Sequence, residues 1–175
     1  HGAPGIGLCA AKAYEIYGDE EYLEVAKYAA EAVWGAGLLY KGVGLCHGVG
    51  GNGYIFLTLF KFTGNQIYWD RAVSFAVACA EWEQKTKEGA FRGKICVKKI
   101  CLQIAPVRRK VDALRRRLFA GGSCTLIHTA SPVARTVPDH PWSLYEGLAG
   151  GAYFVGDVVY FEPAAYKGFP GLSDV

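Results

Sequence analysis

Methionine is absent from the 175 residues, and the chain begins at His1 without the charged and then apolar leader of a secreted protein. We therefore expect a fragment whose parent protein continues upstream of His1. The six cysteines are too few and too irregularly placed for a disulfide scaffold, which favours a reducing, cytoplasmic compartment. The longest stretch without Asp, Glu, Lys or Arg, residues 42–60, holds six glycines, an asparagine and a histidine, so it does not predict a membrane span.

Acidic residues are scarce in one part of the chain. From Lys85 to Arg135 there are 13 basic and two acidic residues, a net charge of +11, and the rest of the chain carries a net charge of −8. We interpret residues 86–134 as a basic insertion that is poorly ordered or an artefact of gene prediction. The alternative is an arm that binds an anionic membrane or nucleic acid. We do not expect nucleic acid, because neither interleaved aromatic residues nor a known binding motif accompanies the charge.

Apolar periodicity predicts four helices before this insertion. Residues 6–17 make a mostly buried helix that Gly18 ends, and an amphipathic helix up to residue 34 begins at Asp19 as its N-cap. Residues 53–62 are apolar nearly all round, and residues 66–84 are again amphipathic. The chain therefore alternates between buried and amphipathic helices.

An internal repeat appears when the sequence is shifted by 46 residues. His1 then matches His47, Gly18 matches Gly64, and Asp19 matches Asn65. A third glycine-rich loop, residues 145–151, also precedes apolar residues. Since each unit places a glycine loop before an apolar helix and returns by an amphipathic one, the sequence predicts an all-α fold, a partial α/α toroid of inner and outer helices.

This architecture divides the chain into three parts. Residues 1–85 hold the two helical repeats, and residues 86–134 form the basic insertion. Residues 135–175 hold the last inner helix and a C-terminal tail, which we expect to lie on the surface.

The glycine loop between residues 41 and 54 places a thiol and an imidazole side by side at Cys46 and His47. Such neighbours converge on one point only from an irregular backbone, which glycine permits. Both are ligands that suit Zn²⁺, and the dipole and free N–H groups of the following helix would favour a thiolate. We interpret the pair as half of a zinc site. The alternative is a buried structural thiol beside a hydrogen-bonded histidine.

The repeat also makes a prediction about the residue before His1. That position matches Cys46, so a cysteine there would give one metal three protein ligands and an open fourth position. This is the pattern of a catalytic zinc. For the chain as given, we expect weak or substoichiometric zinc.

Three motifs carry a resemblance to a known family. His1–Gly5, residues 44–54 and residues 138–147 resemble the eukaryotic LanC-like (lanthionine synthetase C-like) proteins, whose motifs read approximately WCHGAPG, GLCHGxxGNxY and PDxPFSLFEGxxG. The resemblance implies an α/α toroid with one zinc ion at its mouth, bound by Cys46, His47 and a cysteine just before His1. It also implies that His1 faces the substrate as a catalytic residue and that Lys41 and Arg135 hold glutathione, although Val137 interrupts the motif near Arg135.

The activity implied by this resemblance is the addition of glutathione to dehydroalanine or dehydrobutyrine residues of proteins or peptides. Zinc lowers the pKa of a thiol, so that a thiolate can attack the β-carbon of the alkene. We expect a cytoplasmic protein, with peripheral contact at the plasma membrane left open. Lys41 could equally serve only as a basic residue at a helix C-terminus.

Two other interpretations remain. The chain could be a non-catalytic zinc- or glutathione-binding or scaffold fragment, since it lacks one ligand and half of the ring, and we expect it to be inactive alone. It could also belong to another α/α barrel family. A glycosidase is disfavoured, because the glycine loops offer no facing pair of carboxylates.

Overall fold

The computed structural model describes residues 1–38, 42–82, 113 and 143–172. These residues form five helices and no strand: α1 (Gly2–Tyr17), α2 (Glu20–Ala36), α3 (Val49–Thr63), α4 (Gln66–Ala80) and α7 (Leu148–Val159). The all-α prediction is confirmed. The basic insertion, with the single exception of Ala113, lies outside the described residues, so its order stays a prediction.

The helix ends confirm the 46-residue repeat. Gly18 and Gly64 end α1 and α3 in the left-handed conformation, with φ angles of 70° and 63°. The side chains of Asp19 and Asn65 then cap α2 and α4 by accepting hydrogen bonds from Glu21 N–H at 2.9 Å and Ile67 N–H at 3.1 Å. Two matching pairs of residues thus make the same turn between an inner and an outer helix.

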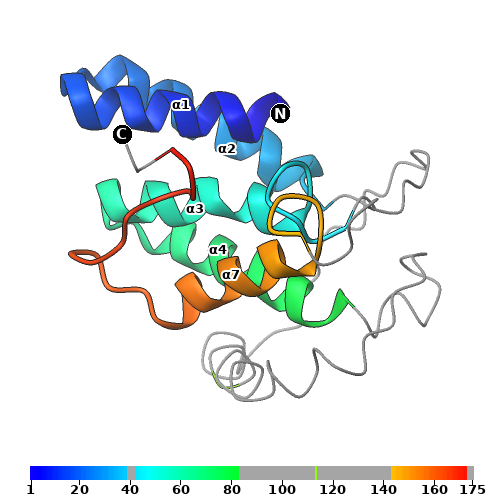
Figure 1. The fold of residues 1–175 in the computed structure, drawn as a ribbon. Helices are drawn as coiled ribbons and strands as arrows, with labels where there is room; N and C mark the ends of the chain where they lie inside the picture. Colours follow the sequence, from blue (N-terminus) through cyan, green and yellow to red (C-terminus); the bar gives the residue numbers. More distant parts are fainter. Residues whose placement is uncertain (39–41, 83–112, 114–142, 173–175) are drawn as a thin grey trace.

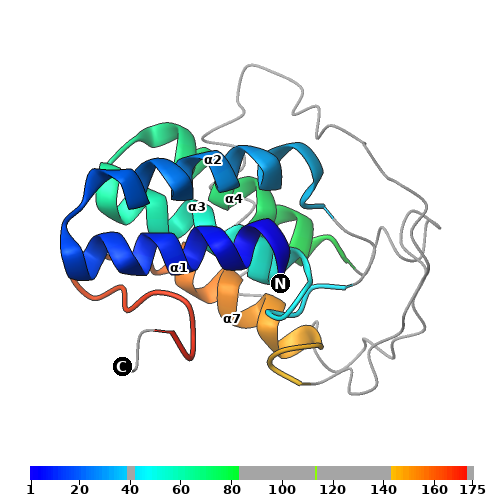
Figure 2. The same cartoon turned by 90° about the horizontal axis from the view of Figure 1, so that it is seen from above.

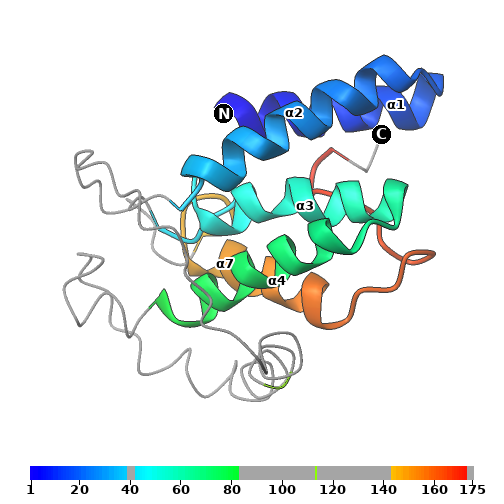
Figure 3. The same ribbon diagram turned by 180° about the vertical axis from the view of Figure 1, so that it is seen from behind.

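The helices form two layers, as expected for part of an α/α toroid. Helix α3 lies between the α1–α2 pair and the α4–α7 pair, which Figures 1 and 3 show from opposite sides. Figure 2 shows α1 and α2 running side by side. Helix α3 also contacts each of the other four helices. It is buried from Val49 to Leu59, because all of its sides face a neighbour.

Two helices differ from the sequence prediction in their burial. Helix α1 is less buried than expected, with Ile6 60% exposed, because its outer side has no neighbouring helix among the described residues. Helix α4 is more buried than an amphipathic helix, since it packs against both α3 and α7. Arg71 of α4 is itself buried, where it pairs bidentately with Glu31 and lies 5.0 Å from the ring of Trp34.

The segment after α7 lies on the surface, as expected, but it is packed against the helices. The C-terminal segment 161–172 folds back over the helices, and Tyr166 is buried. The ring of Phe169 meets the ring of Tyr54 edge to face, with centroids 5.3 Å apart, and Phe161 packs against Trp69. Aromatic side chains spaced along this segment bind it to the core, because their burial removes a large apolar area from water.

None of the helices in the described ranges is both long and apolar enough to cross a membrane.

Candidate functional site

The Cys46 loop folds over the N-terminus of α3. Val49 N–H donates to Gly42 O at 2.9 Å, and Gly51 N–H donates to Gly44 O at 3.2 Å. The loop carbonyls therefore use amide groups that we expected to be free to stabilise a thiolate. The expectation of free N–H groups at the start of α3 does not hold for these two amides, because the loop doubles back instead of entering the helix directly.

A second loop holds the Cys46 loop from the other side. Cys46 N–H donates to Tyr145 O at 2.7 Å, and Leu45 N–H donates to Leu144 O at 3.4 Å. The second loop is itself closed by Ser143, whose Oγ accepts from Glu146 N–H at 2.9 Å. The backbone position of the thiol is thus fixed by residues far along the chain.

Glycine is required where these segments meet. A Cβ atom on Gly44 would lie 2.4 Å from Tyr145 O, and one on Gly51 would lie 1.8 Å from Leu45 O. No side chain fits at such distances from a backbone atom. The glycines of the motif therefore permit close packing of the two loops as well as an irregular backbone.

Asn52 anchors the start of the loop region. Its side chain is buried, and its Nδ2 donates to the carbonyl oxygen of Gly37 at 2.7 Å, just after α2 ends. This bond joins the first turn of α3 to the segment that leads into the loop. An asparagine directly before a predicted apolar helix is a sequence signal that could have identified Asn52, because a polar side chain buried there needs a hydrogen-bond partner.

The structure brings three of the predicted residues together. Cys46 and His47 are half-buried in the loop, and His1 is exposed at the start of α1. The ring centroids of His1 and His47 lie 6.0 Å apart, and the His1 side chain makes no capping hydrogen bond to its helix. Lys41 and Arg135 lie outside the described residues, so their predicted roles are untested.

The metal prediction is not confirmed. Within the described ranges, no group of three or more His, Cys, Asp and Glu side chains is placed to hold a metal ion. Cys46 and His47 fit zinc in the chemistry of their donor atoms, but they supply two of the three protein ligands expected.

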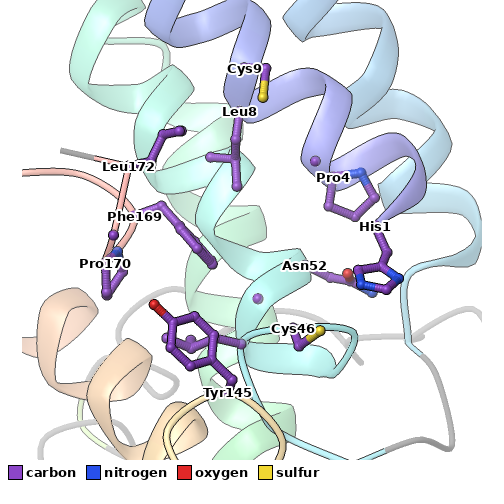
Figure 4. A pocket seen from close by; sticks show the side chains of 14 residues that line it. His1, Pro4, Leu8, Cys9, Cys46, Asn52, Tyr145, Phe169, Pro170 and Leu172 are labelled. Carbon is purple, nitrogen blue, oxygen red and sulfur yellow. The ribbon is translucent and has the colours of Figure 1, made fainter. Parts of the chain in front are cut away.

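A cavity of about 350 Å³ opens beside the loop (Figure 4). His1 and Cys46 line one side, and the C-terminal segment closes the opposite side with Phe169, Pro170 and Leu172. Tyr145 and Cys9 also line it. The sequence analysis missed this far wall, because it did not place the C-terminal segment beside the Cys46 loop.

Two ionisable side chains, those of Tyr54 and Asp157, lie behind the wall that Phe169 forms. Tyr54 Oη donates to Asp157 Oδ2 at 2.5 Å, between α3 and α7. Burial raises the pKa of Asp157, and the hydrogen bond from Tyr54 opposes this rise in part. Burial and the contact with Asp157 also raise the pKa of Tyr54, which keeps the phenol protonated.

These observations define an all-helical, partial-toroid protein with a Cys-His loop on a cavity, and comparisons with known proteins agree. The family model for "Lanthionine synthetase C-like protein" matches residues 1–95. The chain belongs to this family.

Two curated relatives are similar to the chain. It is 32% identical to "Glutathione S-transferase LANCL1" of Danio rerio over 170 residues, 97% of this chain and 29% of that protein. It is 46% identical to "LanC-like protein GCL1" of Arabidopsis thaliana over 77 residues, 43% of this chain and 18% of that protein. The chain thus spans less than a third of the length of either relative.

Proposed function

We propose that the protein containing this chain adds the thiol of glutathione to dehydroalanine or dehydrobutyrine residues of proteins or peptides. The observation that carries the proposal is the convergence of Cys46 and His1 on one cavity, with the His47 ring 6.0 Å from that of His1. Similarity to a relative named a glutathione S-transferase supports glutathione as the thiol.

Cys46 and His47 are the residues of this chain that would hold a zinc ion, with a third ligand from the residue before His1. A bound zinc ion lowers the pKa of a thiol that joins it, so that a thiolate is available near neutral pH. The loop can hold its two ligands in a fixed geometry, because the carbonyl of Tyr145 and the Asn52 side chain restrain its backbone.

The proposed reaction adds S–H across a carbon–carbon double bond. The thiolate sulfur forms a bond to the β-carbon, and the π electrons move toward the α-carbon and the adjacent carbonyl as an enolate. One proton is then delivered to the α-carbon, so atoms and charge balance without an oxidant or reductant. We assign that proton transfer to the His1 imidazole, which lines the same cavity as Cys46.

The charged groups of glutathione need partners of opposite charge. Lys41 and Arg135 are the proposed partners of its carboxylates, as the family resemblance implies. We also propose a cytoplasmic location, where glutathione is abundant, with peripheral contact at the plasma membrane.

A second candidate function is binding of zinc or glutathione without catalysis. It is supported by the finding that, among the described residues, Cys46 and His47 are not part of a group of three or more metal ligands. The two functions separate in an assay of the adduct itself, because a binding fragment holds glutathione without forming the thioether.

The experiment extends the chain by one residue before His1. A cysteine there completes the three-ligand set, and a serine in the same place is the matched control. We expect the cysteine-extended chain to bind zinc at a ratio of one to one, at least tenfold more tightly than the serine-extended chain, as measured by competition with a chromophoric chelator. Equal affinities would overturn the three-ligand site.

Activity is then measured with zinc, glutathione and a dehydrobutyrine peptide. Mass spectrometry reports the glutathione adduct, and chromatography separates its diastereomers. The proposed function predicts one diastereomer from the full-length protein that contains this chain, and its loss when His1 of this chain is replaced by alanine there. A mixture of diastereomers at the rate seen without protein would contradict catalysis.

A further inference from the structure

The cavity beside Cys46 has two chemically different sides. His1, Cys46 and Asn52 group on one side, and Leu8, Phe169 and Leu172 lie on the other (Figure 4). The first side carries the groups that the proposed reaction uses. The second side is apolar and has no part in the chemistry described so far.

Charge decides which reactant suits this cavity. Among the residues that the structure describes, no Lys, Arg, Asp or Glu lines it. Burial of a charged group without a partner is costly, so the carboxylates and the ammonium group of glutathione do not fit there. The acceptor peptide, whose alkene is uncharged, is the reactant that the lining accommodates.

The apolar side is held by the core of the fold. Phe169 packs on Tyr54, which is fully buried, and the side chain of Tyr166 in the same segment is also buried. A wall fixed in this way offers a preformed surface, so that binding does not have to order it. The volume of the cavity, about 350 Å³, lies within the range of small-molecule pockets.

We propose that this cavity selects acceptor peptides with a bulky apolar side chain, such as Leu or Phe, next to the dehydroamino acid. The inference rests on the proposed function for the identity of the reactive group. The dehydroamino acid lies beside Cys46 and His1, and the neighbouring side chain lies against Leu8, Phe169 and Leu172. Burial of that side chain is worth about tenfold or more in affinity.

The test measures peptide binding separately from turnover. Fluorescein-labelled peptides carry 2-aminobutyrate, the saturated analogue of dehydrobutyrine, with Leu, Phe, Asp or Lys beside it. Fluorescence anisotropy with the whole chain then gives each affinity without glutathione or zinc. We expect the Leu and Phe peptides to bind at least tenfold more tightly than the Asp peptide.

Two variants place a carboxylate on the cavity wall. Tyr145 is 47% exposed and Cys9 is exposed, so Tyr145→Glu and Cys9→Asp do not open the core. Each should lower the affinity for the Phe peptide about tenfold and raise that for the Lys peptide. Tyr28→Glu is the matched control, because Tyr28 is 82% exposed on α2 and does not line the cavity.

The outcomes separate this inference from the proposed function. If the four peptides bind equally, or if Tyr28→Glu changes the preference as much as Tyr145→Glu, the inference is overturned whatever the activity. If the preference and its reversal appear but no peptide ever gains glutathione, the cavity assignment stands and the proposed function fails.

Discussion

The backbone N–H of Cys46 donates a 2.7 Å hydrogen bond to the carbonyl oxygen of Tyr145, so two glycine loops from distant parts of the chain hold Cys46 between them. A third contact, from Asn52 to Gly37, restrains the approach to the same loop. Because these restraints are made largely by the backbone, the conformation of the Cys46 loop depends more on the close approach of backbone segments than on particular side chains. The predictions below test this arrangement and the core that supports it.

The space around two glycines predicts opposite effects on stability when each is replaced by alanine. Gly51→Ala places a Cβ 1.8 Å from Leu45 O and should destabilise the protein by about 3 kcal/mol. Gly156→Ala meets nothing within 4 Å inside α7 and should stabilise it by about 0.5–1 kcal/mol. Urea unfolding followed by circular dichroism measures both. Equal losses from the two variants would show that the loop contact is not specific.

The Tyr54–Asp157 hydrogen bond predicts a loss of stability in Tyr54→Phe. The variant keeps the packing of the ring against Phe154 and Phe169 but leaves the half-buried carboxylate of Asp157 without this donor. We expect a loss of about 1–3 kcal/mol in the free energy of unfolding. A change below about 0.5 kcal/mol would mean that water replaces the donor at no cost.

Asp157 also predicts a pH dependence. Because burial raises the pKa of its carboxyl, the folded protein holds this proton more strongly than the unfolded chain does. The resulting stability is present in full below the usual pKa of 3.8 and is lost as the pH rises through the higher folded pKa.

Asp157→Asn removes that titration and still offers an oxygen to Tyr54. The stability of this variant relative to the original chain should therefore increase with pH from about 4 upward. Glu15, whose pKa Lys61 lowers, gives the opposite slope, but it does so in both proteins and cancels in the difference. If the difference in stability between Asp157→Asn and the original chain stayed constant with pH, this prediction would be contradicted.

The contacts of the buried Arg71 predict that a positive charge alone at this position does not preserve the stability of the protein. Lysine cannot reproduce the bidentate contact with Glu31 or the stacking on Trp34, so Arg71→Lys should cost about 1–3 kcal/mol. Lys27→Ala, which removes the exposed ion pair with Glu24, is the control and should cost below about 0.5 kcal/mol. Thermal unfolding of both variants gives the comparison, and similar losses would reject a special role for Arg71.

Local signals in the sequence predicted the helices, the glycines that end α1 and α3 and the caps that begin α2 and α4, whereas α1 and α3 each begin four residues earlier than predicted. Asp19 and Asn65 act within two residues of their own positions, so the amino-acid types alone identify them as caps. The 46-residue repeat and the apolar helix near residue 55 likewise predicted the layered, all-helical fold, because they reflect which faces must be buried.

Contacts between distant residues could not be predicted in the same way. Nothing near Cys46 indicates that Tyr145 accepts its N–H, and nothing near Phe169 indicates that Tyr54 lies beneath it. The burial of α4 and the exposure of Ile6 depend on which helices are neighbours, a property of the whole assembly. The cavity was missed for this reason, since one of its walls comes from the C-terminal segment.

Alkylation of the cysteines with and without zinc tests the central claim, that the Cys46 loop is a metal site for thiol chemistry. The site of modification is read by peptide mass spectrometry, and two cysteines serve as internal controls. Cys9 is exposed, and burial raises the pKa of the Cys79 thiol, so we expect fast modification of Cys9 and slow modification of Cys79 under both conditions.

The account predicts that zinc slows the alkylation of Cys46 at least tenfold in the cysteine-extended chain, leaves Cys9 unchanged, and loses this effect in His47→Ala. Alkylation of Cys46 at the same rate with and without zinc would contradict it.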